Sequence, residues 1–314
     1  MNLACRLLTS LGLLALLSFL VYVGVDVLPG DPVSSRLGPT ASAERIAELR
    51  HHLGLDRPVL IRYAEWVAGL ARGDLGVSAS GRPVAEMMSD RVGNSALLAG
   101  IASALLAPLS LVLGLWAAGR RGKAADVAVS AGALLLVSLP EFVVAGALVL
   151  VFAVTLRVLP AVSLLPAGAS PLAHPQVLVL PVLSLLLVGL GYAVRLIRAS
   201  ASATLTGPHV EFLRLSGASG ATVLRRAVIP AVLPVAVQVW LVTAVAFAGG
   251  AVLVEKVFGY PGIGELLVAS VQAGDLPVVQ ALVLMLGAAM LGALALADLG
   301  VVLLTPRLRT AAGT

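Results

Sequence analysis

The sequence predicts an all-α integral membrane protein with six transmembrane helices and a small helical segment outside the membrane between the first two. Hydrophobic residues make up 59% of the chain and charged residues 12%, and the mean hydropathy is +1.04. Soluble domains contain roughly 25% charged residues. Uncharged runs close to the ~20 apolar residues of a membrane-spanning helix recur along the chain. These observations exclude an ordinary soluble domain.

Six apolar runs are long enough to be spanning helices. They cover residues 7–25, 92–119, 127–156, 177–194, 227–254 and 276–297. The third run is interrupted by Pro140 and Glu141. A count of four helices would discard strong runs, and a count of eight would split them below spanning length, so six is the preferred number.

The first run could also be a secretory signal. It is longer than the ~7–15 residues of a signal core, and Leu28-Pro29-Gly30-Asp31-Pro32 follows it in place of a small-residue cleavage site. We therefore interpret residues 1–28 as a retained first helix. The sole cysteine, Cys5, excludes an intrachain disulfide and any cysteine-based metal cluster.

Residues 29–94 form the only sizeable segment predicted to lie outside the membrane. Ser42 is a suitable N-cap for a first short helix with Ile46, Leu49 and Leu53 on one face. Pro58 suits the first turn of a second helix, over which apolar residues continue at helical spacing (Leu60, Tyr63, Val67, Leu70). About 65 residues with two short helices could cover a helix bundle but would be marginal as an independent domain.

The basic residues predict the orientation in the membrane. They gather before the first helix, between the second and third, between the fourth and fifth, and after the sixth (Arg6; Arg120, Arg121, Lys123; Arg195, Arg198, Arg214, Arg225, Arg226; Arg307, Arg309). Short loops rich in Lys and Arg stay in the cytoplasm. Both termini are therefore expected inside, with a helical core at 95–306 and a cytoplasmic tail at 307–314. The same topology explains the positive net charge without a nucleic-acid partner.

A polar, basic loop at about 199–228 is the strongest functional signal. Glu211 is followed six residues later by Gly217, and the candidate contact residues surround them (Glu211, Phe212, Leu213, Arg214, Gly217, Ala218). We expect a helix–glycine–helix element in which Gly217 allows a positive φ angle. Glu211 is expected to tie the loop to a neighbouring arginine or a backbone amide. Such an element is a docking surface for a cytosolic partner.

The Glu211–Gly217 spacing resembles the EAA loop of ABC importer permeases, which seats a short coupling helix in a groove of a separate ATPase. Nearly the whole chain resembles the first permease subunit of dipeptide, oligopeptide and nickel importers of this class. Phe212 and Leu213 stand where that family usually has two alanines, and Ser216 where it has a lysine. The matching strings are, in order, LPGDP (28–32), LGLDRPVLIRYAEWVAGLARGDLG (53–76), RPVAEM (82–87), SLPEF (138–142), YAVRLIRAS (192–200), VEKVFGYPGIGELL (254–267) and DLPVVQ (275–280).

The resemblance implies a function and a set of partners. The chain would be a non-catalytic permease subunit in a bacterial cell membrane, importing di- or oligopeptides by alternating access, with nickel chelates or other small ligands as the alternative. Its partners would be a second homologous permease, one or two ABC ATPases, an extracellular substrate-binding protein and the lipid bilayer. The chain itself would bind no cofactor, because ATP and Mg²⁺ belong to the ATPases.

Further residues have two readings each. Glu141, after Pro140 in an apolar run, is either a residue of the translocation path or a carboxylate stabilised by water and freed backbone groups. Arg57 and Glu65 outside the membrane, and Glu255 and Lys256 at the outer end of the fifth helix, are candidates for contact with the binding protein or plain surface residues.

The sequence also argues against other classes. It has no G-x-x-x-x-G-K-[ST] phosphate loop, no H-E-x-x-H metal motif and no nucleophile elbow. A secondary transporter and a membrane scaffold or membrane enzyme remain alternatives. Secondary transporters often have broken helices at corresponding positions in two halves. Here Pro140 and the Pro230/Pro234 pair do not correspond.

Overall fold

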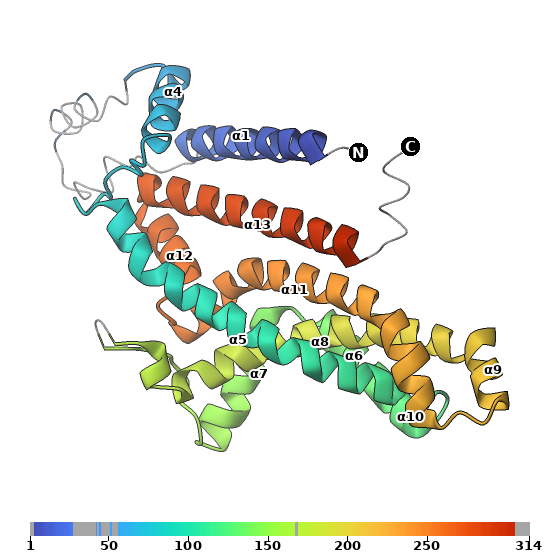
Figure 1. Cartoon of the computed structure of the whole chain (residues 1–314). Helices are drawn as coiled ribbons and strands as arrows, with labels where there is room; N and C mark the ends of the chain where they lie inside the picture. The colour runs from blue at the N-terminus through green and yellow to red at the C-terminus, as the bar shows by residue number, and fades with distance from the viewer. Residues whose placement is uncertain are drawn as a thin grey trace. The chain divides into compact units, whose positions relative to one another are not determined.

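The structure is a computed structural model that describes residues 3–27, 42, 44, 51, 56–166 and 169–304. These residues form helices joined by short turns, and an isolated bridge between Val77 and Pro83 is the one β-type pairing among them. They divide into two compact units, residues 1–95 with 261–291, and residues 96–260 with 292–314 (Figure 1). The predicted helix at Ile46–Leu53 lies outside the described residues.

The first unit contains α1 (Leu3–Val27), α4 (Val59–Leu70), the start of α5 (Val84–Ala118), α12 (Ile263–Ala273) and most of α13 (Leu276–Leu304). The prediction of α4 is confirmed, because the helix begins directly after Pro58. Tyr63 of α4 packs edge-on against Phe19 of α1, and its hydroxyl lies 2.8 Å from Ser18 Oγ. α1 and α4 are therefore held together by aromatic and polar contacts.

The second unit contains the rest of α5, then α6 (Ala124–Ser138), α7 (Glu141–Leu148), the π-helix η1 (Val149–Thr155), the short 3₁₀ helix η2 (Pro171–Ala173) and α8 (Gln176–Leu205). They are followed by α9 (Pro208–Leu215), α10 (Gly220–Val223), the π-helix η3 (Leu224–Val228) and α11 (Ile229–Phe258). α8 contacts α6, α7 and α11, and it contributes most of its apolar side chains to the core of this unit (Figure 1).

The apolar run at 127–156, which the sequence shows interrupted at Pro140 and Glu141, forms two helices with a sharp bend between them. α6 ends at Ser138 and α7 begins at Glu141, and the two axes differ by 108°. Pro140 lacks an N–H group and disfavours the helical conformation at Leu139, which is extended here (φ −95°, ψ 133°). The pair α6–α7 is thus a broken span or a re-entrant element.

Several boundaries differ from the sequence-based ones. α5 begins at Val84, inside the range 29–94, and α8 continues to Leu205, so that Arg195 and Arg198 belong to a helix. Residues 261–291 group by their contacts with residues 1–95. A glycine-rich turn follows α11, with Gly259 at a φ angle of +60°, and a further helix, α12, begins after it.

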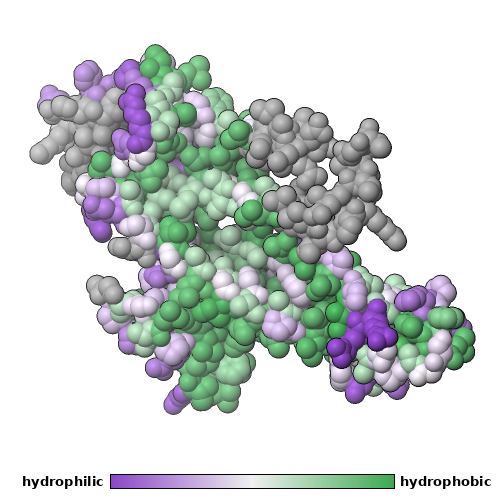
Figure 2. All heavy atoms as spheres, in the orientation of Figure 1, coloured by the Kyte–Doolittle hydropathy of each residue, from purple (hydrophilic) through white to green (hydrophobic). Residues whose placement is uncertain are grey.

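Four helices of the described residues are long and apolar enough to cross a membrane, or up to five if the bent pair is one span. A shorter apolar stretch, Leu11–Gly24, lies in α1. The all-helical membrane architecture is confirmed at this coarser level. Figure 2 shows apolar side chains over much of the visible surface of the second unit, and hydrophilic ones at the end that carries α9 and α10.

Gly191 makes close packing between α8 and α6 possible. A Cβ atom built on it would lie 2.7 Å from the Ala133 carbonyl oxygen and 3.0 Å from Val137 N. Both neighbours are backbone atoms, which cannot rotate away. Overpacking of this kind costs about 1–3 kcal/mol.

We therefore expect Gly191→Ala to lower the free energy of unfolding by about 1–3 kcal/mol. Gly132→Ala is the matched control, since a Cβ on that α6 glycine meets nothing within 4 Å. Thermal denaturation of the purified complex measures both. Equal midpoints for the two variants would contradict the close approach.

Candidate functional site: the α9–α10 loop and its supports

The loop between α8 and α11 is a helix–glycine–helix element, as predicted. α9 ends at Leu215, and Gly217 has a φ angle of +79°. Gly217 N donates to Arg214 O and Ala218 N donates to Leu213 O, each at 3.0 Å. This pair of bonds is a Schellman motif, which needs a left-handed residue after the helix. A Cβ on Gly217 would meet nothing within 4 Å, so the constraint on this position is the backbone angle.

The second helix of the loop begins at a side-chain cap. Ser219 precedes α10, and its Oγ accepts a hydrogen bond from Thr222 N at 3.3 Å. Serine is among the preferred residues at this position, because its oxygen satisfies a free N–H group of the first turn. The reversal between α9 and α10 is therefore fixed on both sides, by the C-terminal motif of one helix and by the N-cap of the next.

One face of the loop is anchored in the second unit. Val210 is 1% exposed and Val223 2% exposed, and both pack with Ile197 of α8 and Val232 of α11. Leu213 and Ala218 are partly buried against the same cluster. An apolar face at this helical spacing holds the loop to the ends of α8 and α11. The loop is thereby continuous with the bundle.

The opposite face is apolar and exposed. Phe212 is 67% exposed and Leu215 is 83% exposed, three residues apart on α9. Glu211 and Arg214 are also exposed. The expected tie from Glu211 to an arginine or a backbone amide is not seen among the described residues, which give its carboxylate no hydrogen bond or ion pair. Sequence reasoning missed Leu215, although its spacing from Phe212 indicated it.

An ion pair supports the helix that leads into the loop. The guanidinium of Arg198 on α8 donates from Nε and Nη2 to the two carboxylate oxygens of Asp126, at 2.8 Å for Nη2 to Oδ2. Asp126 Oδ2 also accepts from Gly122 N at 3.0 Å. The Asp126 side chain is 5% exposed and the Arg198 side chain 27%. Bidentate pairs of this type fix geometry as well as charge.

Glu141 is the first residue of α7, at the 108° bend. A Cβ on Gly250 of α11 would lie 3.3 Å from Glu141 Oε1, so the glycine leaves room for the carboxylate. The side chain is half-buried, and the described residues give it no hydrogen bond or ion pair. Pro140 lies at the N-cap position of the same helix.

The expectation that Glu255 is a surface residue is wrong. Its side chain is 0% exposed, on the face of α11 that also buries Val254 and Phe258. Lys256, the next residue, is exposed. Burial, and to a lesser extent the neighbouring Glu255 carboxylate, raises the pKa of Tyr260, so its hydroxyl stays protonated at physiological pH.

Arg57 and Glu65 are exposed, as predicted, but they bind each other. Arg57 Nη1 and Nη2 donate to the two oxygens of Glu65 at 2.8 and 2.7 Å, with side chains 52% and 55% exposed. Such exposed pairs contribute little to stability. Their charges are neutralised locally, so the pair presents a smaller field to a partner than two free charges would.

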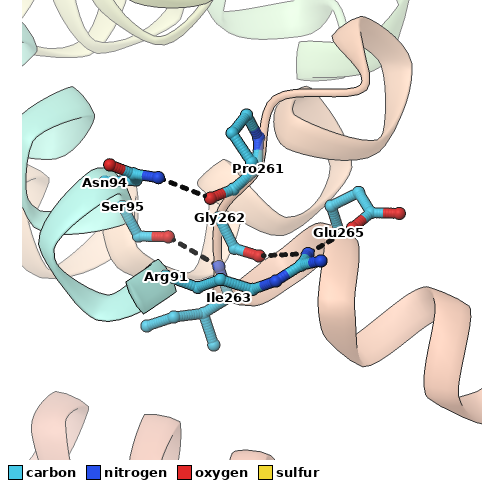
Figure 3. A network of polar contacts seen from close by, with 7 residues as sticks. All are labelled: Arg91, Asn94, Ser95, Pro261, Gly262, Ile263 and Glu265. Atoms are coloured by element: carbon cyan, nitrogen blue, oxygen red, sulfur yellow. Dashed lines mark hydrogen bonds and ion pairs between the residues drawn. The ribbon is translucent and has the colours of Figure 1, made fainter. Parts of the chain in front are cut away.

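The glycine-rich turn before α12 is held by a polar network within the first unit (Figure 3). Asn94 Nδ2 donates to Pro261 O and Ser95 Oγ accepts from Ile263 N, both at 2.8 Å. Arg91 pairs with Glu265 at 2.5 Å. α5 thus gives the Ile263 N–H group, at the first turn of α12, a partner that it would otherwise lack, and it binds two carbonyl groups of the preceding turn.

The comparisons with known proteins agree with the architecture. Residues 110–310 match the family "Binding-protein-dependent transport system inner membrane component", and residues 2–91 match the N-terminal family of such membrane components. A peptide transport system permease protein of Brucella abortus is 32% identical over 309 residues, covering 97% of both chains.

Two further relatives have similar coverage. A peptide ABC transporter permease protein of Sinorhizobium fredii is 29% identical over 311 residues, covering 97% of both chains. The metal-staphylopine import system permease protein of Staphylococcus aureus is 31% identical over 305 residues, covering 96% of this chain and 95% of the relative.

The resemblance inferred from the motifs is confirmed by these matches. The family description and the apolar helices together place the protein in the bacterial plasma membrane as a multi-pass component. Permease components of this type are generally non-catalytic, and partner subunits hydrolyse ATP. The chain belongs to the binding-protein-dependent transport system inner membrane components, as a peptide-type ABC importer permease.

Proposed function

We propose that this permease imports di- or oligopeptides, forms half of an alternating-access pathway, and receives the motion of cytosolic ATPases through α9 and Gly217. The observation that carries the proposal is the exposed apolar pair Phe212 and Leu215 on a loop whose other face is anchored in the bundle. Exposed apolar side chains beside a rigid support suit insertion into a groove of a partner.

The proposed topology has six spans with both termini inside. α1, with 25 residues, is long enough for a span, and the bent pair α6–α7 would count as one more. Lys and Arg residues in the short loops favour the cytoplasmic side for the α9–α10 end. One six-helix chain would enclose only part of a pathway, so a second, homologous permease is part of the proposal, together with one or two ATPases and an extracellular binding protein.

The substrate class rests on the relatives. The Brucella and Sinorhizobium relatives are named for peptides, which favours di- or oligopeptides here. The Staphylococcus relative is named for metal-staphylopine import, so a metal chelate or another small ligand is the second candidate. We assign no cofactor to this chain, with ATP and Mg²⁺ bound by the ATPases.

Other residues receive roles within the same proposal. Glu141, beside Pro140 at the bend, would face the translocation path and attract a cationic group. Lys256 and the Arg57–Glu65 pair would lie on the surface that receives the binding protein. Glu255, being buried in the chain, is left out of that surface.

Reconstitution tests the proposal. We expect proteoliposomes that contain this chain with its second permease and ATPases to take up a labelled dipeptide only when ATP and loaded binding protein are both present. A labelled nickel chelate, offered separately, tests the second candidate. Uptake that follows a proton gradient without ATP would contradict the importer mechanism and favour a secondary transporter.

A further inference from the structure

A pocket between α6 and α8 has no role in the function proposed above. It has a volume of about 370 Å³ and lies within the second unit. Ser130 lines it from α6, and the remaining wall comes from α8 (Tyr192, Arg195, Leu196, Arg198, Ala199). Tyr192, Arg195 and Arg198 follow one another at intervals of three residues, so α8 turns one polar stripe toward it.

The pocket has an excess of one positive charge. Arg198 is paired with Asp126 through two hydrogen bonds, which neutralises it. Arg195 has no hydrogen bond or ion pair within the described part of the chain. A guanidinium cannot lose its proton at any physiological pH, so its charge needs a counter-ion or water.

The other polar groups of the pocket are able to donate hydrogen bonds. Ser130 Oγ is buried in the wall of the pocket, close to the Asp126 carboxylate. Tyr192 is 41% exposed and adds a phenolic hydroxyl. A guanidinium and two hydroxyls around one net positive charge match a monoanion with several acceptor oxygens, as in a phosphodiester.

The surroundings of the pocket point to a lipid. Val127 and Leu134 lie three residues before and four residues after Ser130, on the same side of α6, and are 62% and 51% exposed. They form an apolar strip next to the polar pocket. Ser130 is six residues into α6, about 9 Å from its first residue, and a long arginine side chain can reach a headgroup from such a depth.

We propose that the pocket of Ser130, Tyr192 and Arg195 binds the headgroup phosphate of an anionic phospholipid, with phosphatidylglycerol as the fitting chemistry. The acyl chains would lie along Val127 and Leu134. A bound lipid would occupy the space between α6 and α8 next to the Asp126–Arg198 pair, and so would stabilise the packing of α6 against α8, the helix that leads into the α9–α10 loop. Anionic headgroups attract basic residues near a membrane surface in this way.

The test uses the whole transport complex, purified in detergent, freed of native lipid and titrated with short-chain phosphatidylglycerol. Native mass spectrometry counts the bound lipid. We expect one tightly held phosphatidylglycerol for each copy of this chain, at concentrations where phosphatidylethanolamine is not retained. Arg195→Leu should weaken this binding about ten-fold or more. Ser130→Val should weaken it less, and Arg195→Lys should keep most of it.

The control is Arg225→Leu, which removes an exposed basic residue of η3 outside the pocket. It should bind phosphatidylglycerol as the unchanged complex does, and co-purification of the partner subunits verifies that every variant assembles. Equal phosphatidylglycerol binding by the unchanged complex and Arg195→Leu would overturn the proposal. Displacement of the lipid by millimolar inorganic phosphate would also overturn it, because the site would then be one for free anions.

Discussion

Replacing Phe212 and Leu215 together with aspartate is expected to abolish ATP-driven uptake and to leave membrane insertion intact. The two side chains are 67% and 83% exposed, so the change removes little packing within the chain. In the proposed contact they would enter an apolar groove of the ATPase, where two buried, unpaired carboxylates are strongly unfavourable. Co-purification of the ATPase and substrate-stimulated ATP hydrolysis in nanodiscs measure the effect.

The matched control is Leu172→Asp. Leu172 is 63% exposed, in η2 rather than in the α9–α10 loop, so its replacement introduces a charge of the same kind at a comparable exposed apolar position. We expect it to leave ATPase binding unchanged. Normal stimulated hydrolysis in the Phe212/Leu215 variant would show that α9 does not couple this chain to the ATPase.

Variants of Gly217 separate the shape of the loop from its contact surface. Gly217→Val forces a β-branched residue to a φ angle of +79°, where L-residues pay roughly 1–2 kcal/mol. Gly217→Asn tolerates this angle better and should retain more coupling. Gly220→Ala changes a glycine with no positive φ and no neighbour within 4 Å of the added Cβ, so it should be neutral.

The sequence predicted the existence of the long helices better than their ends. An uncharged run of about 20 residues is long enough to cross the lipid as a helix, so α5, α8, α11 and α13 could be predicted from the sequence. Hydropathy does not predict how far a helix continues beyond its apolar run into water. The first turns of α5, with Glu86 and Arg91, and the last turns of α8, with Arg195 and Arg198, were therefore placed outside them.

Two features of the fold depended on tertiary contacts. The bend of 108° between α6 and α7 needs Pro140, but its size is set by packing on α8 and α11. The start of α12 has Gly262 at the N-cap and Gly264 in the first turn, which is typical of a turn. Ser95, Asn94 and Arg91 bond to this start from a helix some 170 residues earlier. A local sequence pattern cannot predict contacts with residues so distant in the chain.

The backbone conformation of the site was predicted from the sequence, but which of its side chains are exposed was not. The Glu211–Gly217 spacing predicted a helix ended by a left-handed glycine, because that turn is local and glycine is its preferred residue. Which residues face outward depends on how α9 lies on the bundle. Packing of Val210 and Leu213 inward left Phe212 and Leu215 outside, and packing of α11 buried Glu255.

The ion pair between Asp126 and Arg198 should be the polar contact on which the second unit depends most. Asp126→Ala removes the partner of a partly buried guanidinium and also the acceptor for Gly122 N. A partly buried charge that loses its partner is strongly destabilising. We expect the denaturation midpoint of the complex to fall by several degrees, and ATP-driven uptake to fall with it.

Graded replacements show which bond matters. Asp126→Asn keeps an oxygen for Gly122 N and should fall between Asp126→Ala and the unchanged protein. Arg198→Lys keeps the charge but not the planar fork, so it should retain only part of the stability.

The double change Asp126→Leu with Arg198→Leu should be less harmful than the two single changes added together, because it leaves neither charge unpaired. Arg121→Leu, an exposed basic residue of the adjoining loop, is the control. Strict additivity of the two leucine changes would mean that the pair contributes no coupling, and that other contacts, such as the packing around Gly191, hold α6 and α8 together.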